Sequence, residues 1–589
     1  MSKAMATPLK PVDIVIVGGG FTGLTMAKEL CTRTNLSVLV LERGRLRTAM
    51  EYASSMDHID YSARFRMMQN IADETIAHRH AMRDRSVPVR QYGSFLPGTG
   101  VGGAGEHWAG HAYRFTPEFF RLRSHLGERF GAARLPAGLA VQDWGVTYDE
   151  LESHYWRAEQ TLGVGGKAGN LRGQIVDGGD PFEGPRQQEY PLPPCKSSYF
   201  SSLFADATRQ LGFHPSVTPS ALLSEAYTNP DGIVRPACLY CGYCSGFGCM
   251  VGAKAQPSNT ILPVLQDRPG FELRTMSWVR RVLHKSGRVT GVHYSDEEGN
   301  DFFQPSAIVV LASWTLNNVR LLLLSKIGTP YDAASGKGTL GSNLTHQVQS
   351  GTRVFFDKPL NAFMGGGAVG TRISDFDGDR SLTGDEGVLR LGSIHAASQG
   401  DRPIDTFGIV PSGTVSANWG SEWKAAAVDW YDRTAVISFI GEHLAWLQNF
   451  MDLDPTYTDK VGDPLLRFTL DWTEHEHRQR EIGDERARMI ARAMGAVPDD
   501  TRPSRGRYDV SRYQTTHIQG GAIMADSPDN GVVNRYLQHW DVPDLWVLGA
   551  SAFPQNPSHN PTLTALALTT WAADALIERY LKSPGRSVA

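Results

Sequence analysis

Long hydrophobic runs, basic clusters and evenly spread cysteines are all missing from this sequence of 589 residues. No run of about 18 apolar residues occurs, so the sequence predicts no transmembrane helix. The net charge of −4, without a basic run, gives no reason to expect binding to nucleic acid or to an anionic membrane. Only six cysteines are present, and four of them crowd together, which is not how a disulfide framework is distributed.

What is present is typical of a large soluble protein. Hydrophobic residues make up 41% of the chain and charged residues 20%, and the length suggests two to four domains. The first apolar stretch runs directly into a glycine motif, so we interpret it as a strand and not as the core of a signal peptide. Any export or membrane attachment is therefore expected to come from a partner chain.

Near the N-terminus, a glycine motif separates a short apolar run from a helical pattern. Residues 12–17 (VDIVIV) are apolar and β-branched, and Gly18, Gly20 and Gly23 follow with GxGxxG spacing. A second apolar run ends at Glu42. In such a βαβ unit the glycines let the backbone approach a pyrophosphate, and the acidic residue accepts hydrogen bonds from a ribose. The pattern predicts dinucleotide binding; the alternative is a glycine-rich turn without a ligand, with Glu42 a solvated strand end.

A second glycine-rich segment, residues 95–111, reads FLPGTGVGGAGEHWAGH. Because glycine tolerates backbone conformations that other residues avoid, this segment can wrap closely around a flat ligand. The alternative is a mobile surface loop, but Trp108 and the histidines His107 and His111 argue against it. We interpret His111 as structural.

The most unusual feature is the cysteine cluster in the loop 236–252. Cys238, Cys241, Cys244 and Cys249 have the spacing CxxCxxCx4C, which lets several thiolates converge on one centre. This spacing favours an iron–sulfur cluster. Zinc is the first alternative, although four-thiolate zinc sites more often use two hairpins with a longer spacer, and buried cysteines without a ligand are the second.

Several of these segments together resemble the glucose–methanol–choline (GMC) oxidoreductase family. The tetrapeptide LERG at 41–44 is similar to its FAD fingerprint, and VGGAGEHWAG at 101–110 to its flavin-contact loop. From His517 onwards, the chain contains the four parts of the family's C-terminal signature in order. Residues 307–328 resemble its second signature, with Ser313 and Trp314 in place of the usual Ala-Gly.

The resemblance implies roles for individual residues. His517 would be the general base and Asn560 would bind the same substrate hydroxyl; the alternative is a core histidine and a helix cap. His107 matches the histidine that pyranose oxidases bond covalently to the flavin, and a non-covalent contact is its alternative. The remaining contacts to FAD implied by the resemblance come from Gly102, Gly103, Trp108, Gly549, Ala550, Pro561 and Thr562.

The expected fold is α/β, with a Rossmann-like FAD-binding domain and an antiparallel-sheet substrate domain. Residues 1–345 and 506–589 would form the first domain, and residues 346–505 the second. Within the second we expect β-rich stretches at 352–357 (TRVFFD) and 425–440 (AAAVDWYDRTAVISFI).

Within the family, the segments RQYGSFLPGTGVGGAGEHWAGH and CLYCGYCSGFGC most resemble flavoprotein subunits of gluconate and fructose dehydrogenases. That resemblance implies oxidation of a secondary alcohol of a sugar or sugar acid, with D-gluconate at C2 as the first expectation. It also implies a 3Fe–4S cluster, a small subunit that carries the export signal, a cytochrome c or quinone partner, and a place on the periplasmic side of the bacterial inner membrane. An oxygen-using sugar oxidase and an electron-transfer module without its own substrate are the alternatives.

Two further patterns imitate functional motifs. Asp375, Asp377 and Asp379 resemble a calcium loop but lack its glycine, so we interpret them as a solvated acidic loop. The run His475-Glu476-His477 is interpreted as the exposed face of a helix.

Overall fold

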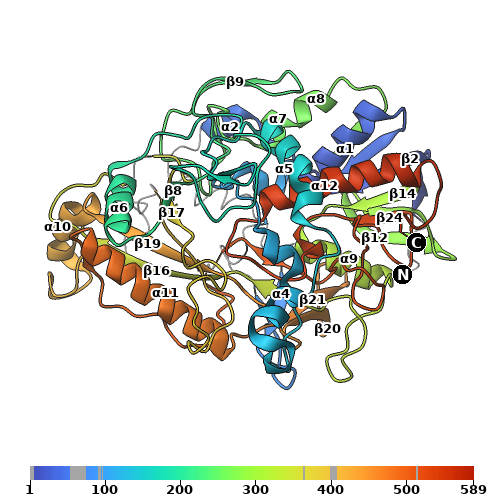
Figure 1. Ribbon diagram of the computed structural model, residues 1–589. Helices are drawn as coiled ribbons and strands as arrows, with labels where there is room; N and C mark the ends of the chain where they lie inside the picture. The colour runs from blue at the N-terminus through green and yellow to red at the C-terminus, as the bar shows by residue number, and fades with distance from the viewer. Residues whose placement is uncertain are drawn as a thin grey trace.

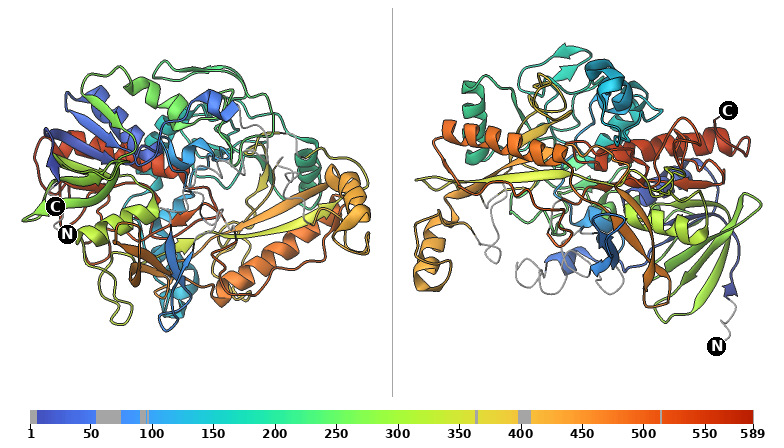
Figure 2. Two further views of the ribbon diagram at one scale, coloured as in Figure 1. Left: turned by 180° about the vertical axis from the view of Figure 1, so that it is seen from behind. Right: turned by 90° about the horizontal axis from the view of Figure 1, so that it is seen from below.

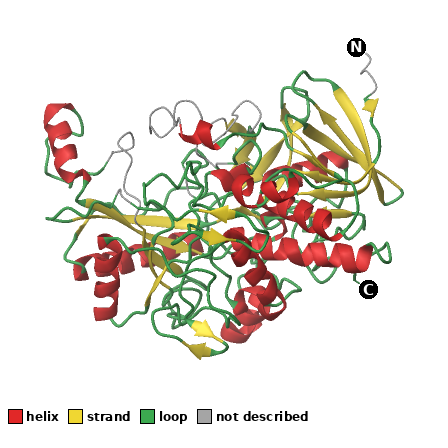
Figure 3. Cartoon of the chain, turned by 90° about the horizontal axis from the view of Figure 1, so that it is seen from above, coloured by secondary structure: helices red, strands yellow, loops and turns green. Residues whose placement is uncertain are grey.

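Two β-sheets organise the computed structural model, and their strands gather on opposite sides of the molecule (Figure 1, Figure 3). The structure describes residues 6–53, 75–89, 95, 97–362, 365–397, 408–512 and 515–588. Leu96, which belongs to the predicted loop 95–111, lies outside these residues. Among the described residues, no helix combines the length and the apolar character needed to cross a bilayer.

The first sheet has a parallel core that follows the predicted βαβ unit. Its parallel strands are β2 (Val12–Val17), β3 (Val38–Leu41), β11 (Phe271–Arg274), β14 (Asp301–Leu311) and β24 (Leu545–Val547). Continuous buried runs of Val, Ile and Leu in β2 and β3 are typical of parallel strands that are covered on both faces.

The first half of β14 has different partners. It pairs with β13 (Arg288–Ser295), which in turn pairs with β12 (Trp278–Lys285), so an antiparallel extension continues the parallel core. The short strand β1 (Thr7–Pro8) also pairs with β14.

Three helices pack together beside the first sheet and bring distant parts of the chain to one place. Helix α1 (Phe21–Arg33) lies beside α12 (Thr562–Ala575), and α5 (Tyr148–Leu162) packs against α12 (Figure 1). Helix α12 is apolar on nearly all its faces, which is typical of a helix inside a protein. Helix α12 therefore begins in the interior of the protein, on the side of the glycine turn that precedes α1.

The second sheet is antiparallel throughout. Its order is β22 (Val497–Pro498), β16 (Val348–Phe355), β19 (Thr434–Gly441), β18 (Gly392–Ala397), β17 (Gly370–Ile373) and β8 (Pro215–Val217). Helix α11 (Glu474–Ala493, orange in Figure 2) packs on β16 and β19, and α6 (Tyr199–Gln210) packs on β17 and β18.

Hydrophobic packing crosses the expected domain limits at two places. Helix α6 and strand β8 precede residue 346 yet belong to the second sheet and its core. The hairpin of β20 (Phe450–Thr458) and β21 (Pro464–Thr469) follows residue 346 yet packs into the core of the first sheet and pairs with β4 (Ile76–Arg79), which pairs with β5 (Val87–Val89). The limits 1–345, 346–505 and 506–589 stay a prediction.

The structure corrects three expectations from the sequence. The first part of the stretch 425–440 is not a strand, because Gly420–Tyr431 form helix α10, as its three consecutive alanines favour. Asp377 and Asp379 are buried and not solvated. The charge of Asp377 is compensated by an ion pair with Arg372. In α11, His475 and Glu476 are also buried and therefore do not form an exposed face.

Candidate functional site

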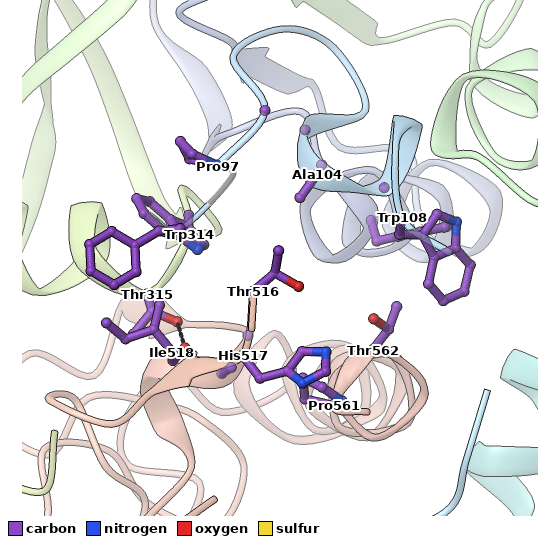
Figure 4. Close-up of a pocket in the computed structure, with 18 of the residues that line it drawn as sticks. Pro97, Ala104, Trp108, Trp314, Thr315, Thr516, His517, Ile518, Pro561 and Thr562 are labelled. Carbon is purple, nitrogen blue, oxygen red and sulfur yellow. Dashed lines mark hydrogen bonds between the residues drawn. The ribbon is translucent and has the colours of Figure 1, made fainter. Parts of the chain in front are cut away.

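A cavity of about 590 Å³ lies where the glycine turn, the loop after residue 95, the second sheet and the C-terminal segment meet. Figure 4 shows Pro97, Ala104 and Trp108 on one side of it, and Thr516, His517 and Thr562 on the other. The cavity lining includes nearly all of the predicted cofactor and catalytic residues: Gly18, Gly20, Glu42, Gly102, Gly103, His107, Trp108, His517, Gly549, Ala550, Asn560, Pro561 and Thr562. Gly23 is the exception, and it lies behind the glycine turn.

The glycine turn has the geometry that its spacing predicts. Gly18 adopts φ +104°, and a Cβ there would lie 2.5 Å from the carbonyl oxygen of Ala312. A Cβ on Gly23 would lie 2.0 Å from the carbonyl oxygen of Gly18, so only glycine lets α1 sit this close to the turn. Gly20 instead faces the cavity, where a ligand's pyrophosphate can approach the backbone.

Glu42 holds this turn together from the end of β3. Its two carboxylate oxygens accept hydrogen bonds from the amides of Gly19 and Gly44, each at 2.9 Å. Burial raises the pKa of Glu42, and the two amides oppose that shift. A carboxylate can accept about four hydrogen bonds, so the position remains compatible with the predicted contact to a ribose.

The second glycine-rich loop packs directly on the first. The amide of Gly102 donates to the carbonyl oxygen of Gly19 at 2.7 Å, which joins two motifs that are about 80 residues apart in the sequence. Trp108 is fixed by its indole N–H, which donates to the carbonyl of Ala255 at 2.7 Å. The loop therefore forms a rigid wall of the cavity.

His107 offers a reactive atom at this wall. Its side chain is buried, and its Nε2 has no hydrogen-bond partner among the described residues. Burial, together with the charge of Lys254, lowers the pKa of His107 to about 3, so the ring is neutral and its nitrogen is nucleophilic. An unpartnered buried nitrogen on the lining of a cavity fits the predicted flavin contact, and whether the bond is covalent stays a prediction.

The predicted catalytic pair is in contact. The side-chain amide of Asn560 lies 3.2 Å from Nε2 of His517, and Nδ1 of His517 is hydrogen-bonded to Oε1 of Gln347. The Nε2 of Gln347 donates to the carbonyl of Pro557 at 2.7 Å, so its Oε1 must face the histidine. The oxygen can only accept, which places the proton of His517 on Nδ1 and leaves on Nε2 a lone pair that faces the Asn560 amide.

Gln347 is the functional residue that the sequence did not reveal. It is the last residue of the segment 340–347 (LGSNLTHQ), and nothing in that sequence points to position 347. It is fully buried at the start of β16. Burial lowers the pKa of His517 to about 3, with smaller effects from His346 and His111, so the base is neutral at physiological pH.

The C-terminal segment supplies the rest of the wall. Gly549 and Ala550 follow β24 and line the cavity. In open parallel sheets, ligands bind at the edge where the carboxyl ends of the strands lie. Pro561 and Thr562 begin α12 and bring its N-terminus to the cavity (Figure 4). The partial positive charge of a helix N-terminus stabilises a nearby anion.

Trp314 occupies a position where the family usually has glycine. Its φ of 75° lies in the left-handed region, which costs a non-glycine residue roughly 1–2 kcal/mol. Its ring lines the cavity and packs on Phe95 at 6.4 Å between ring centroids. The residue therefore holds a backbone conformation that favours glycine, and its indole forms part of the cavity wall.

Comparisons with known proteins agree with this site. Models described as GMC oxidoreductase match residues 233–349 and 448–569, and one described as FAD dependent oxidoreductase matches residues 13–164. The gluconate 2-dehydrogenase flavoprotein of Pantoea cypripedii is 40% identical over 99% of this chain and 96% of its own length. The chain belongs to the GMC oxidoreductase family.

More distant relatives of this GMC oxidoreductase extend over the same length. The fructose dehydrogenase large subunit of Gluconobacter japonicus is 26% identical over 97% of this chain and 99% of its own. A crystal structure of pyridoxine 4-oxidase from Mesorbium loti has a TM-score of 0.58 at 16% identity, covering 96% and 99% of the two chains, and shows the fold alone. The predicted α/β fold class and the prediction of an FAD-dependent oxidoreductase acting on CH–OH donors are thereby confirmed.

The cysteine loop of this GMC oxidoreductase lies against the flavin loop. The amide of Gly246 donates to the carbonyl oxygen of His107 at 2.7 Å, and Ser245 and Gly246 both line the cavity. Cys244 is therefore the immediate sequence neighbour of a residue in the cavity wall. It is 5% exposed, whereas Cys241 lies on the surface.

The thiols gather in one region, together with one cysteine that the sequence sets apart. Cys195 and Cys238 pack against a small core that contains Cys244, and Cys249 is an electrostatic neighbour of Cys238 and Cys244. Burial raises the pKa of Cys238 and Cys244 to about 11. In the described part of the chain, no group of three or more His, Cys, Asp or Glu is arranged as a metal site.

The chemistry of this donor set nevertheless fits an iron–sulfur cluster. Short spacings place the four thiols of the motif on one loop, and thiolates are the ligands that such clusters use. The buried ammonium group of Lys254 lies among Cys241, Cys244 and Cys249 and offsets negative charge there. The cluster and its nuclearity stay a prediction.

Proposed function

We propose that this chain is the catalytic flavoprotein subunit of a dehydrogenase that oxidises a secondary alcohol of a sugar acid, with D-gluconate at C2 as the substrate. Electrons would leave through an iron–sulfur cluster on the loop 236–252 to a cytochrome c or quinone partner. The identity of 40% with a gluconate 2-dehydrogenase flavoprotein over nearly the full length supports the substrate class.

One contact carries the proposal of an electron exit. The hydrogen bond from Gly246 to the carbonyl of His107 places the cysteine loop on the wall of the flavin cavity. A one-electron carrier held by this loop would lie next to the flavin. An oxidase that uses oxygen needs no such carrier, so this contact favours a dehydrogenase.

The chain's own residues would perform the proton chemistry. His517 Nε2 carries a lone pair and accepts the proton of the substrate hydroxyl, while Gln347 keeps the other ring nitrogen protonated. The Asn560 amide donates to the same substrate oxygen and fixes its direction. FAD, when bound, supplies the hydride acceptor at its N5 atom.

The partners follow from the same proposal. The relatives are named as a flavoprotein and as a large subunit, which supports assembly with other chains. We propose a small subunit that carries the export signal, a cytochrome c subunit, and a place on the periplasmic side of the inner membrane through these partners. Co-expression with such subunits and fractionation of the cells would test this, and a flavoprotein that stays in the cytoplasmic fraction alongside both subunits would contradict it.

The first test uses the purified chain loaded with FAD. We expect iron and acid-labile sulfide in amounts near three irons per flavin, a yellow precipitate in acid from covalent FAD, and oxidation of D-gluconate with an artificial acceptor but not with oxygen. Protein without iron, combined with rapid turnover in oxygen, would replace the dehydrogenase by the oxidase. The electron-transfer module without substrate is disfavoured by the contact between His517 and Asn560.

A further inference from the structure

Two histidines with unpartnered ring nitrogens face each other at the end of the cavity that the second sheet forms. His111 comes from the flavin loop and His395 from β18, and both line the cavity. Their ring centroids are 6.3 Å apart at an interplanar angle of 81°. Nδ1 of His111 and Nε2 of His395 are buried and have no hydrogen-bond partner in the described structure.

Unpartnered nitrogens of this kind indicate a ligand. A buried polar atom without a partner costs about 1–3 kcal/mol, so a fold rarely keeps two of them side by side without use. Neither ring contributes to the catalytic pair, although His111 is an electrostatic neighbour of His517. The pair of histidines therefore lies within reach of the reacting end of a substrate.

A fixed positive charge lies directly behind this pair. Arg372 of β17 is the cross-strand neighbour of His395 and is 2% exposed. It pairs with Asp377 at 3.3 Å and donates to Nε2 of His559 at 3.0 Å, which holds the guanidinium in place. Its charge adds to burial in lowering the pKa of His111 to about 4. Arg372 thus places a cation, partly offset by Asp377, next to the two histidines.

The cationic side chains of the cavity lining lie on the side of the first sheet. Among the described residues, the charged side chains of the lining are Glu42, Arg43, Arg280 and Arg320. Both Arg280 and Arg320 pair with Asp459, and they come from β12 and the helix α9 (Thr315–Ser325) beside the first sheet. A negatively charged substrate group at the second sheet would therefore meet the histidine pair.

We propose that His111 and His395 anchor the carboxylate of a 2-hydroxy sugar acid, with Arg372 as a positioning charge behind them. This inference rests on the proposed function and deepens it, because it also explains the position of oxidation. In an aldonate the carboxylate is bonded to the carbon whose hydroxyl is oxidised at C2. An anchor close to His517 presents that carbon to the base and keeps the distant hydroxyls away from it.

The test compares D-gluconate with D-gluconamide, which has the same hydroxyls but no charge. In FAD-loaded enzyme we make His111→Leu, His395→Leu and Arg372→Met, with His293→Asn on the distant strand β13 as the control. Losing a hydrogen bond to a charged group should raise KM for gluconate about tenfold or more. KM for gluconamide should change less than about threefold, and the control should change neither. Where a leucine variant fails to bind FAD, glutamine replaces leucine.

The outcomes separate this inference from the proposed function. Equal losses for the acid and the amide would overturn the anchor and leave gluconate oxidation standing, and so would a wild-type enzyme that does not prefer the acid. Should the wild-type enzyme oxidise neither compound, the proposed function fails, and titration of the flavin absorbance with gluconate decides on the anchor. Gluconate binding that is present in the wild type and lost in the histidine variants would support the anchor. Absence of gluconate binding to the wild type would overturn it.

Discussion

Gln347 makes a sharp prediction about the catalytic base. Replacing it by methionine removes the acceptor that holds the proton on Nδ1 of His517, with little change in side-chain volume. An unsatisfied buried group costs about 1–3 kcal/mol, which corresponds to a fall in kcat of about 5- to 150-fold. KM for the substrate should change much less, because the side-chain hydrogen bonds of Gln347 go to His517 and to the backbone of Pro557. Steady-state kinetics with an artificial acceptor measures both constants.

A charged variant tests the same contact through pH. In the wild type, burial lowers the pKa of His517 to about 3, so the base stays neutral at every pH well above that value. Gln347→Glu adds an anion that favours the imidazolium and raises this pKa. Because only the neutral ring can accept a proton, activity should fall as the pH drops through the raised value, giving an acid limb absent from the wild type. Methionine and glutamate variants with wild-type kcat and pH profile would refute the role of Gln347.

Three further variants test the cofactor sites. His107→Ala should release the flavin into the supernatant on acid precipitation, whereas the wild type keeps it in the pellet; flavin retained by the variant would exclude a bond at this residue. Cys244→Ser should lower the iron content, since this thiol is buried beside the flavin loop, and Cys31→Ser in α1 should not, as elemental analysis would show. Gly23→Ala should lower the free energy of unfolding in urea by about 1–3 kcal/mol and weaken FAD binding, because its Cβ would lie 2.0 Å from a carbonyl oxygen. Gly585→Ala is the control, since its Cβ meets no atom within 4 Å. Equal stabilities of the two variants would contradict this interpretation of the turn.

Much of the first sheet could be predicted because its signals are local. The glycines of the turn are recognisable from their spacing in one short segment, and the strands around them are continuous buried runs. The second sheet is harder to predict, since its strands alternate with loops and its strand pairing is set by distant segments. The stretch 425–440 shows the limit: its aromatic residues indicated a strand, yet its alanines lie within a helix, Gly420–Tyr431, that has no buried residue. Neighbouring residues alone do not decide between these outcomes.

The catalytic site shows the same division. His517 and Asn560 could be named because each belongs to a recognisable motif, but Gln347 contacts His517 across 170 residues and no local pattern marks it. His111 was interpreted as structural for a similar reason. Only the fold brings it opposite His395, where its unpartnered nitrogen becomes meaningful.

Lys254 shows how the fold joins the two proposed redox sites. Its ammonium group donates to the carbonyl oxygens of Trp108 at 2.7 Å, Cys244 at 2.9 Å and Phe247 at 2.7 Å, so all three protons are used while the side chain is 1% exposed. Burying a charge is costly unless hydrogen bonds and an opposite charge compensate it. The carbonyls supply the first, and thiolates on the adjacent loop would supply the second. One cation thereby fixes the flavin loop to the cysteine loop. This connection is most useful to the protein if each loop holds a redox centre.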